Sequence, residues 1–339
     1  MIYRFIKVLT SLLLFSSVSY ADVWISQSGS TVNLDVVQDG QDNTMRSLNV
    51  NSGNASFTGN SNTIENTQTG NNNKSGFWAN GNSQTTKLTQ TGNSNTGKID
   101  NHGSTNSIIT TVTGNSNTTH DEIGNGNDTG NSIETIIVGD SNNSYVEVLD
   151  GDNNDIEVQV QNQSNNLVRV YVDGDGNVVK AWQGKHENGD IDNNETGDND
   201  IYWYITGNNN NVASYQTDDN GNGGQYSYND IDGDSNTVKV TQRGAGDHYS
   251  KIDINGNSNN IEVTQRGNSN EQWLDLEVDN GHTVDVFQRY SDHTATIDLT
   301  NSGGAYDLDL NQTANTDQTY SITGVCANAS GCSVSVTQN

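Results

Sequence analysis

The chain has little of what holds an ordinary globular domain together. Of its 339 residues none is proline, two are cysteine, 30% are hydrophobic and 35 are glycine. Such a composition is typical of disordered segments, which bury too little apolar surface to offset the entropy of ordering. The periodicity described below argues against disorder, because a disordered chain does not require an aliphatic residue at every second position.

Positive charge is also scarce. The chain carries 14 Lys and Arg against 42 Asp and Glu, a net charge of −28. DNA and RNA are bound by basic surfaces that neutralise phosphates. The composition therefore argues against a nucleic-acid partner.

Hydrophobic runs are absent except near the amino terminus. Arg4 and Lys7 precede an apolar run from Val8 to Phe15, and Ser19 and Ala21 occupy the small-residue positions before a cleavage site ahead of Asp22. The pattern predicts a signal peptide over residues 1–21, with a one-span membrane anchor as the alternative. We expect residues 22–339 to be exported without a transmembrane helix.

Both cysteines, Cys326 and Cys332, lie near the carboxyl terminus. A disulfide is favoured over free thiols in an exported chain, and it would pin the loop 326–332. A metal site would need more ligands than this pair supplies.

The most regular stretch runs from Asn236 to Asn270 and consists of two similar units 23 residues apart. The matching positions are Asn236, Val238, Val240, Gln242 and Gly244 in one unit, and Asn259, Ile261, Val263, Gln265 and Gly267 in the next. Alternating positions of a strand point to one side, and the glycine- and asparagine-rich turn that follows tolerates positive φ. Each unit thus has two halves of about eleven residues, a strand and a turn in each.

The same eleven-residue interval recurs earlier in the chain. It separates Gly59, Gly70, Gly81, Gly92, Gly103 and Gly114. A repeat this short buries its interior only by stacking on its neighbours. We therefore predict an all-β fold, a β-solenoid of roughly 14 two-strand rungs with a repeat of about 22–23 residues, and an irregular loop near residues 218–228.

The interior of this solenoid should be a thin aliphatic spine flanked by amides. An identical amide on the next rung satisfies both donor and acceptor, whereas an unpaired buried amide costs about 1–3 kcal/mol. The predicted stacking ladder consists of Asn62, Gln68, Asn82, Gln90, Asn236, Gln242, Asn259, Gln265, Gln288, Gln312 and Gln338.

The spacing of Asn259, Gln265, Gly267 and Asn270 resembles the curlin repeat of bacterial curli fibres. Asn62, Gln68, Gly70 and Asn73 keep the same spacing, and the resemblance is strongest over residues 59–117 and 230–339. It implies a secreted amyloid subunit without enzymatic activity, located in fibres at the bacterial cell surface that build an adhesive biofilm matrix. The implied partners are further copies of the chain, a nucleator subunit and outer-membrane secretion machinery.

Growth of such a fibre would use the open strand edges at the two ends of the stack. The predicted fibre-end rungs contain Val32, Leu34, Val36 and Gln38 at one end and Val334, Val336 and Gln338 at the other.

The alternative function is that of a monomeric adhesin, or of a module that binds calcium or carbohydrate. Glycine turns with oxygen ligands, at 150–154, 173–177 and 232–236, are compatible with calcium, although they lack the terminal Glu of an EF-hand, and they are equally compatible with solvated turns. No other cofactor is expected. Exposed aromatic residues could stack on sugars or simply cover strand ends, namely Trp78, Trp182, Trp203, Trp273, Tyr202 and Tyr204.

A polysaccharide-cleaving enzyme is the third candidate, since carboxylates are plentiful. Such enzymes build a cleft from long loops, whereas the connections here are mostly four or five residues. Of the six histidines, only His282 and His293 are spaced so that they could face each other, and they have no third ligand.

Overall fold

The structure is a computed structural model, and every element it describes is a β-strand. It describes residues 22–23, 25–28, 33–46, 55–124, 127–161, 164–184, 199–217, 225–244, 248–266, 273–278, 281–289, 293–299, 305–313, 318–324 and 331–338. The predicted signal peptide over residues 1–21 lies outside these ranges.

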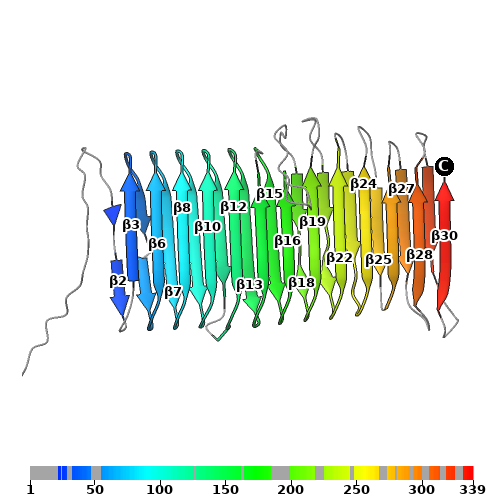
Figure 1. The fold of residues 1–339 in the computed structure, drawn as a ribbon, viewed down its shortest axis with the longest axis horizontal. Helices are drawn as coiled ribbons and strands as arrows, with labels where there is room; N and C mark the ends of the chain where they lie inside the picture. Colours follow the sequence, from blue (N-terminus) through cyan, green and yellow to red (C-terminus); the bar gives the residue numbers. More distant parts are fainter. Residues whose placement is uncertain are drawn as a thin grey trace, which may run out of the picture.

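The strands form two parallel sheets, which the chain visits in turn. Sheet A has 17 strands and sheet B has 13. One rung of the stack is the part of the chain that crosses sheet A once and sheet B once, and Figure 1 shows the strands side by side along the long axis in sequence order. The strands of sheet B are β3 (Asn33–Asp39), β6 (Thr63–Thr69), β8 (Thr85–Thr91), β10 (Ser107–Thr113), β12 (Ser132–Val138), β14 (Asp155–Val160), β16 (Val178–Gln183), β19 (Asn211–Thr217), β22 (Thr237–Arg243), β24 (Asn260–Arg266), β26 (Thr283–Gln288), β28 (Tyr306–Gln312) and β30 (Cys332–Gln338).

Sheet A is more often interrupted than sheet B, because some of its rungs are split into two short strands. Its strands are β1 (Asp22–Val23), β2 (Ile25–Ser28), β4 (Thr44–Arg46), β5 (Ala55–Thr58), β7 (Lys74–Asn80), β9 (Thr96–His102), β11 (Thr118–Ile123), β13 (Asn143–Asp150), β15 (Leu167–Asp173), β17 (Asn199–Tyr202), β18 (Ile205–Thr206), β20 (Gln225–Tyr228), β21 (Ile231–Asp232), β23 (His248–Asp253), β25 (Trp273–Val278), β27 (His293–Leu299) and β29 (Gln318–Thr323).

The predicted β-solenoid is confirmed, with fewer and longer rungs than expected. Sheet B contains 13 strands among the described residues, against the roughly 14 rungs predicted. The predicted number of rungs was too high because the repeat length is not constant. Gln68 and Gln90 are 22 residues apart, but Gln183 and Gln216 are 33 residues apart. A longer interval between equivalent positions uses more of the chain without adding a rung.

Glycine is required at the turns because the next rung lies directly against it. Gly70 has φ +106°, and Asn72, two residues later, has φ +58°. A Cβ built on Gly70 would stand 2.1 Å from the carbonyl oxygen of Gly92, the equivalent turn of the next rung. Any side chain there would force the two turns apart.

Alternation along each strand divides the interior from the surface. In β6 the burial pattern places Ile64, Asn66 and Gln68 inside and the residues between them toward solvent. The interior therefore combines aliphatic side chains with amides, in two layers only.

Part of the predicted loop over 218–228 is a strand. Residues 218–224 lie outside the described ranges, but Gln225–Tyr228 form β20, with Gln225 and Ser227 buried. The alternation in these four residues outweighs the glycine-rich composition of the preceding segment.

Candidate functional site

One row of glutamines runs through the interior of sheet B, each directly above the last. Gln38 Nε2 donates to Gln68 Oε1 at 2.7 Å, and Gln68 Nε2 donates to Gln90 Oε1 at 3.0 Å. Every donor therefore points toward the carboxyl-terminal end of the stack.

The glutamine row resumes farther along with the same polarity. Gln183 donates to Gln216 at 3.2 Å, Gln216 to Gln242 at 2.8 Å, and Gln242 to Gln265 at 2.8 Å. Gln288, Gln312 and Gln338 continue the register, with Gln288 and Gln312 fully buried and the side chain of Gln338 outside the described part.

Three rungs between these two glutamine segments carry aliphatic residues instead. Val112, Ile137 and Val160 occupy the register of the glutamine row, and all three are buried. At the edge of this gap the Nε2 of Gln90 is buried without a hydrogen-bond partner. The three aliphatic residues therefore break the row of hydrogen bonds between glutamine side chains.

A second row, consisting mostly of asparagines, stands at the corner before the strands of sheet B. The Oδ1 of Asn236 accepts from both the backbone N–H and the Nδ2 of Asn259, at 3.0 and 2.9 Å, while Asn236 Nδ2 donates to the carbonyl of Gly256 at 2.8 Å. Asn62 stands in this row too, where its Oδ1 accepts from the backbone of Gln84 at 3.2 Å. Each such amide fastens two successive turns together.

The expected ladder position of Asn82 is wrong. Asn82 is exposed in the turn, where its Oδ1 accepts from the backbone of Asn60, and Gln84 takes the buried corner position two residues later. Asn82 directly follows the turn glycine Gly81, so its side chain points outward from the turn.

A third row at the other corner, before sheet A, was missed from the sequence. In this row the side-chain oxygen of each asparagine before the last accepts the backbone N–H of the next one at 2.9–3.0 Å. The row consists of Asn43, Asn73, Asn95, Asn117, Asn142 and Asn166. The signal was available, because Asn73, Asn95 and Asn117 each stand three residues after a turn glycine.

A carboxylate is enclosed in the same part of the interior as the aliphatic gap. Asp121, on β11, is fully buried and accepts hydrogen bonds from the hydroxyls of Thr110 and Thr135, the latter at 3.0 Å. Burial raises the pKa of Asp121 to about 6, although the two hydroxyls oppose the rise.

The acidic turns use their carboxylates to join rungs. Asp175 Oδ1 accepts the backbone N–H of Asp152 at 2.7 Å, and Asp234 Oδ1 accepts that of Asn208 at 2.6 Å. These oxygens stand in the row that asparagines occupy at other turns. Within the described ranges no group of three or more His, Cys, Asp or Glu side chains is arranged to hold a metal ion.

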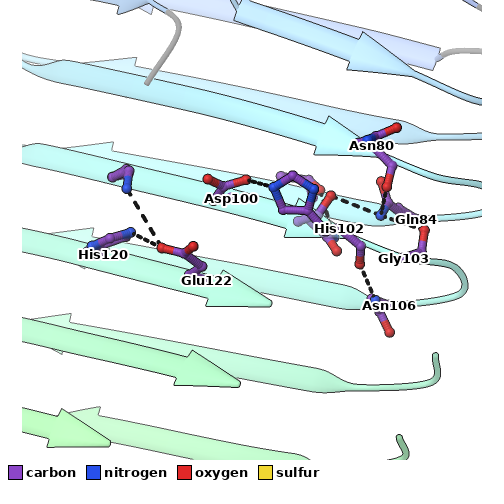
Figure 2. A network of polar contacts seen from close by, with 11 residues as sticks. Asn80, Gln84, Asp100, His102, Gly103, Asn106, His120 and Glu122 are labelled. Atoms are coloured by element: carbon purple, nitrogen blue, oxygen red, sulfur yellow. Dashed lines mark hydrogen bonds and ion pairs between the residues drawn. The ribbon is translucent and has the colours of Figure 1, made fainter. Parts of the chain in front are cut away.

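Two histidine–carboxylate pairs lie on the outer face of sheet A, and sequence reasoning missed both (Figure 2). His102 Nε2 is 2.7 Å from Asp100 Oδ1 on β9, and His120 Nε2 is 2.9 Å from Glu122 Oε2 on β11. The hydrogen bond with Asp100 raises the pKa of His102, against the effect of burial, and the bond with His120 lowers the pKa of Glu122. The signal was the i, i+2 spacing, which puts both partners on one side of a strand.

The histidine pair considered from the sequence is separated by the fold. His282 stands in the asparagine row of the corner before sheet B, where its backbone donates to Asn259 Oδ1 at 2.8 Å and its Nδ1 accepts from the backbone of Tyr306 at 3.0 Å. His293 begins β27 in sheet A. The imidazole of His282 thus takes the place of an asparagine amide.

Two of the six aromatic residues considered for sugar binding are buried. Trp203 is fully buried and Trp182 is 9% exposed, against the expectation of exposed rings. Trp78, Tyr202 and Tyr204 are partly exposed, and the side chain of Trp273 lies outside the described part. Trp203 packs in the hydrophobic core and adds to the apolar spine.

Among the described residues, no further strand covers either end of sheet B. Strands β3 and β30 each pair with one neighbour, β6 and β28. Leu34 and Val36 at one end, and Val334 and Val336 at the other, are only partly buried, whereas Ile64, one rung inside, has no exposed area. Val32 lies outside the described residues.

Cys332, at the start of β30, is disulfide-bonded. The sequence contains one other cysteine, Cys326, which lies outside the described ranges.

Among the described residues no helix is long and apolar enough to cross a membrane.

In the comparison with known proteins, the match falls on the repeat. No curated protein matches the chain. The family model for the curlin associated repeat matches residues 59–92, which contain β6, β7 and β8. Gln68 and Gln90, which are stacked on each other, both fall within this match. The resemblance seen in the sequence is therefore confirmed over these strands, in which the chain carries a match to the curlin associated repeat.

Proposed function

We propose that the chain is a secreted structural subunit of curli-like amyloid fibres, which stack end to end and build an adhesive biofilm matrix. The observation that carries this proposal is the pair of uncovered rungs at the ends of sheet B. Their inward aliphatic residues are partly exposed, and their backbone edges have no neighbour among the described strands. Such edges are templates for pairing with another chain.

The two ends are complementary in register. Placing Gln338 of one copy on Gln38 of the next sets Val336 on Val36 and Val334 on Leu34. The amide donors of Gln38 and Gln68 both point toward the carboxyl-terminal end. A copy added in the same orientation continues the row without reversing it.

Charge also favours this head-to-tail joint. The outward positions of β3 include Asp35 and Asp39, whereas those of β30 are Ser333, Ser335 and Thr337. Two amino-terminal ends would bring carboxylates together, and like charges on neighbouring strands are destabilising. An amino-terminal end on a carboxyl-terminal end avoids that repulsion.

The proposal extends to export out of the cell, with a nucleator subunit and secretion machinery as further partners. These follow from the curlin repeat. The calcium-dependent alternative gains little support from the turns, since Asp175 and Asp234 use an oxygen to bind the neighbouring backbone.

The test is a substitution that blocks one end. Val336→Lys places a charge on the inward side of the last strand, and Ser335→Lys places the same charge on its outward side. We expect wild type and Ser335→Lys to form fibres in negative-stain micrographs with a thioflavin signal, and Val336→Lys to remain monomeric with unchanged circular dichroism. A wild-type chain that stays monomeric for days, or fibres of Val336→Lys equal to wild type, would contradict the proposal.

A further inference from the structure

A column of tyrosines runs along the outer face of sheet A. Tyr145, Tyr171, Tyr204 and Tyr228 stand on four consecutive rungs, and all four are partly exposed. The ring centroids are 5.3 Å apart from Tyr145 to Tyr171, 5.3 Å from Tyr171 to Tyr204, and 5.7 Å from Tyr204 to Tyr228. The middle pair is nearly parallel, with 9° between the ring planes.

The column lies where the backbone ladder of sheet A is divided. Strand β15 pairs with β17 through three residues and with β18 through two, and Tyr204 falls in the break between these segments. By contrast β13 and β15 pair through seven residue pairs. The rung that carries Tyr204 is therefore held by fewer backbone contacts than its neighbour.

Stacking alone would explain aromatic rings here, since such pairs contribute about 0.5–1.5 kcal/mol. Phenylalanine would serve that purpose equally well. The hydroxyls add a second feature: Tyr145 Oη donates to Glu147 Oε2 at 2.8 Å, and Tyr228 Oη donates to Asp230 Oδ2 at 3.1 Å. Each end of the column thus has a carboxylate placed to receive a phenolic proton.

We propose that this column is a site of oxidative cross-linking, at which a haem peroxidase using hydrogen peroxide joins Tyr171 to Tyr204 through a carbon–carbon bond. Each phenol loses one electron and its hydroxyl proton and becomes a phenoxyl radical. The two radicals couple through ring carbons next to the hydroxyls, and the hydrogens on those carbons move to the oxygens and restore both phenols. The two electrons and two protons released reduce one hydrogen peroxide to two waters.

The geometry selects this pair over others. The rings of Tyr171 and Tyr204 are already parallel and in contact, so coupling needs rotation of side chains but no movement of the strands. Glu147 and Asp230 assist oxidation of the outer tyrosines by accepting their phenolic protons. The radical on an outer ring can then oxidise the neighbouring ring of the middle pair. Burial, reinforced by Asp230, raises the pKa of Tyr228 to about 12, so this phenol keeps its proton near neutral pH until it is oxidised.

The product would be a covalent bond between two rungs at the divided part of the sheet. It would close the chain between residues 171 and 204, and the closed loop would restrict the unfolded state. We expect the treated protein to unfold at a higher urea concentration than the untreated one. This inference does not depend on fibre formation.

The test treats the full chain, dilute and monomeric, with hydrogen peroxide and a haem peroxidase, followed by proteolysis and mass spectrometry. We expect a cross-linked pair of peptides containing Tyr171 and Tyr204, two hydrogens lighter than their sum, from protein that still runs as a monomer. Tyr171→Phe should abolish this product. Tyr215→Phe, in which the lost ring packs on Trp182 in sheet B, should leave it unchanged.

The same treatment of the urea-unfolded chain supplies the second control. Products scattered over many tyrosines are expected there, because the column no longer exists. Equal scatter in the folded chain, absence of the Tyr171–Tyr204 product, or its survival in Tyr171→Phe would overturn the proposal.

Discussion

The rungs lined by glutamine and the three rungs lined by aliphatic residues solve the same packing problem differently. From β19 to β24 the row consists of Gln216, Gln242 and Gln265, joined at 2.8 Å. From β10 to β14 the same register holds Val112, Ile137 and Val160, which pack without polar contacts. The strands pair in parallel and in register in both regions.

What both regions share is the asparagine row at the corner. Asn154 Nδ2 donates to Asn131 Oδ1 at 3.0 Å in the aliphatic region, as Asn259 does to Asn236 at 2.9 Å in the glutamine region. The comparison indicates that the corner amides hold the register, whereas the row inside sheet B can be either polar or apolar. A mixed row is the unfavourable case, as the unpartnered Nε2 of Gln90 shows at the boundary.

The largest expected effect is from breaking the glutamine row at its middle. Gln242→Leu removes the rung partner of a buried donor on Gln216 and of a buried acceptor on Gln265, and each loss costs about 1–3 kcal/mol. We expect the free energy of unfolding to fall by about 4 kcal/mol in urea denaturation.

Ile137→Leu is the matched control, because it puts the same residue in the same register where no amide is present. A change below about 1.5 kcal/mol is expected for this volume-conserving substitution. Equal losses in the two variants would show that the glutamine row contributes no more than packing.

The next effect concerns Asp121, whose pKa in the folded chain is about 6 against a usual value of 3.8. Because the folded state binds this proton more tightly, the contribution of Asp121 to stability is greatest below about pH 4 and is lost as the pH rises through about 6. Asp121→Asn keeps hydrogen-bonding atoms for Thr110 and Thr135 without the charge. We expect it to raise the free energy of unfolding by about 3 kcal/mol at pH 7, since one pKa unit corresponds to about 1.4 kcal/mol.

The same variant should match wild type at low pH, where Asp121 is protonated. Urea titrations at pH 7 and near pH 3.5 measure both values. A stabilisation that is equal at the two pH values would contradict a charge effect.

The smallest effect is expected from extending the amide row into the gap. Val112→Gln provides an acceptor for Gln90 but buries a new donor against Ile137, so we expect a loss of about 1 kcal/mol. The triple substitution Val112→Gln, Ile137→Gln and Val160→Gln connects Gln90 with Gln183 in one row. It should be more stable than the sum of its single variants, a coupling that a mutant cycle in urea would measure. Simple additivity would indicate that the amides do not pair.

The sequence was sufficient for the solenoid and for the stacked glutamines, because both follow from residues that recur at a fixed interval. Gln68 and Gln90 could be paired from their spacing alone. It was less informative about the corners, where two amides close together compete for one buried place, as Asn82 and Gln84 do. The choice between them depends on how the turn leaves the strand, which local sequence does not fix.

Contacts between different kinds of residue were harder to foresee. Asp121 lies on a strand of sheet A and its partners Thr110 and Thr135 lie in sheet B, so only the pairing of specific rungs brings them together. The Tyr171–Tyr204 contact spans a long insertion that hides the register. Such neighbours depend on the lengths of the turns, which the repeat does not determine.

The uneven repeat length has a consequence for how such a chain can change. Since 22 residues in one place and 33 in another lead to the same stacking, extra residues between strands leave the strands on either side undisturbed. The interval of the chain between β16 and β17 therefore offers a place to graft foreign peptides. If the fibre forms as proposed, it would display a grafted segment once per subunit along its length.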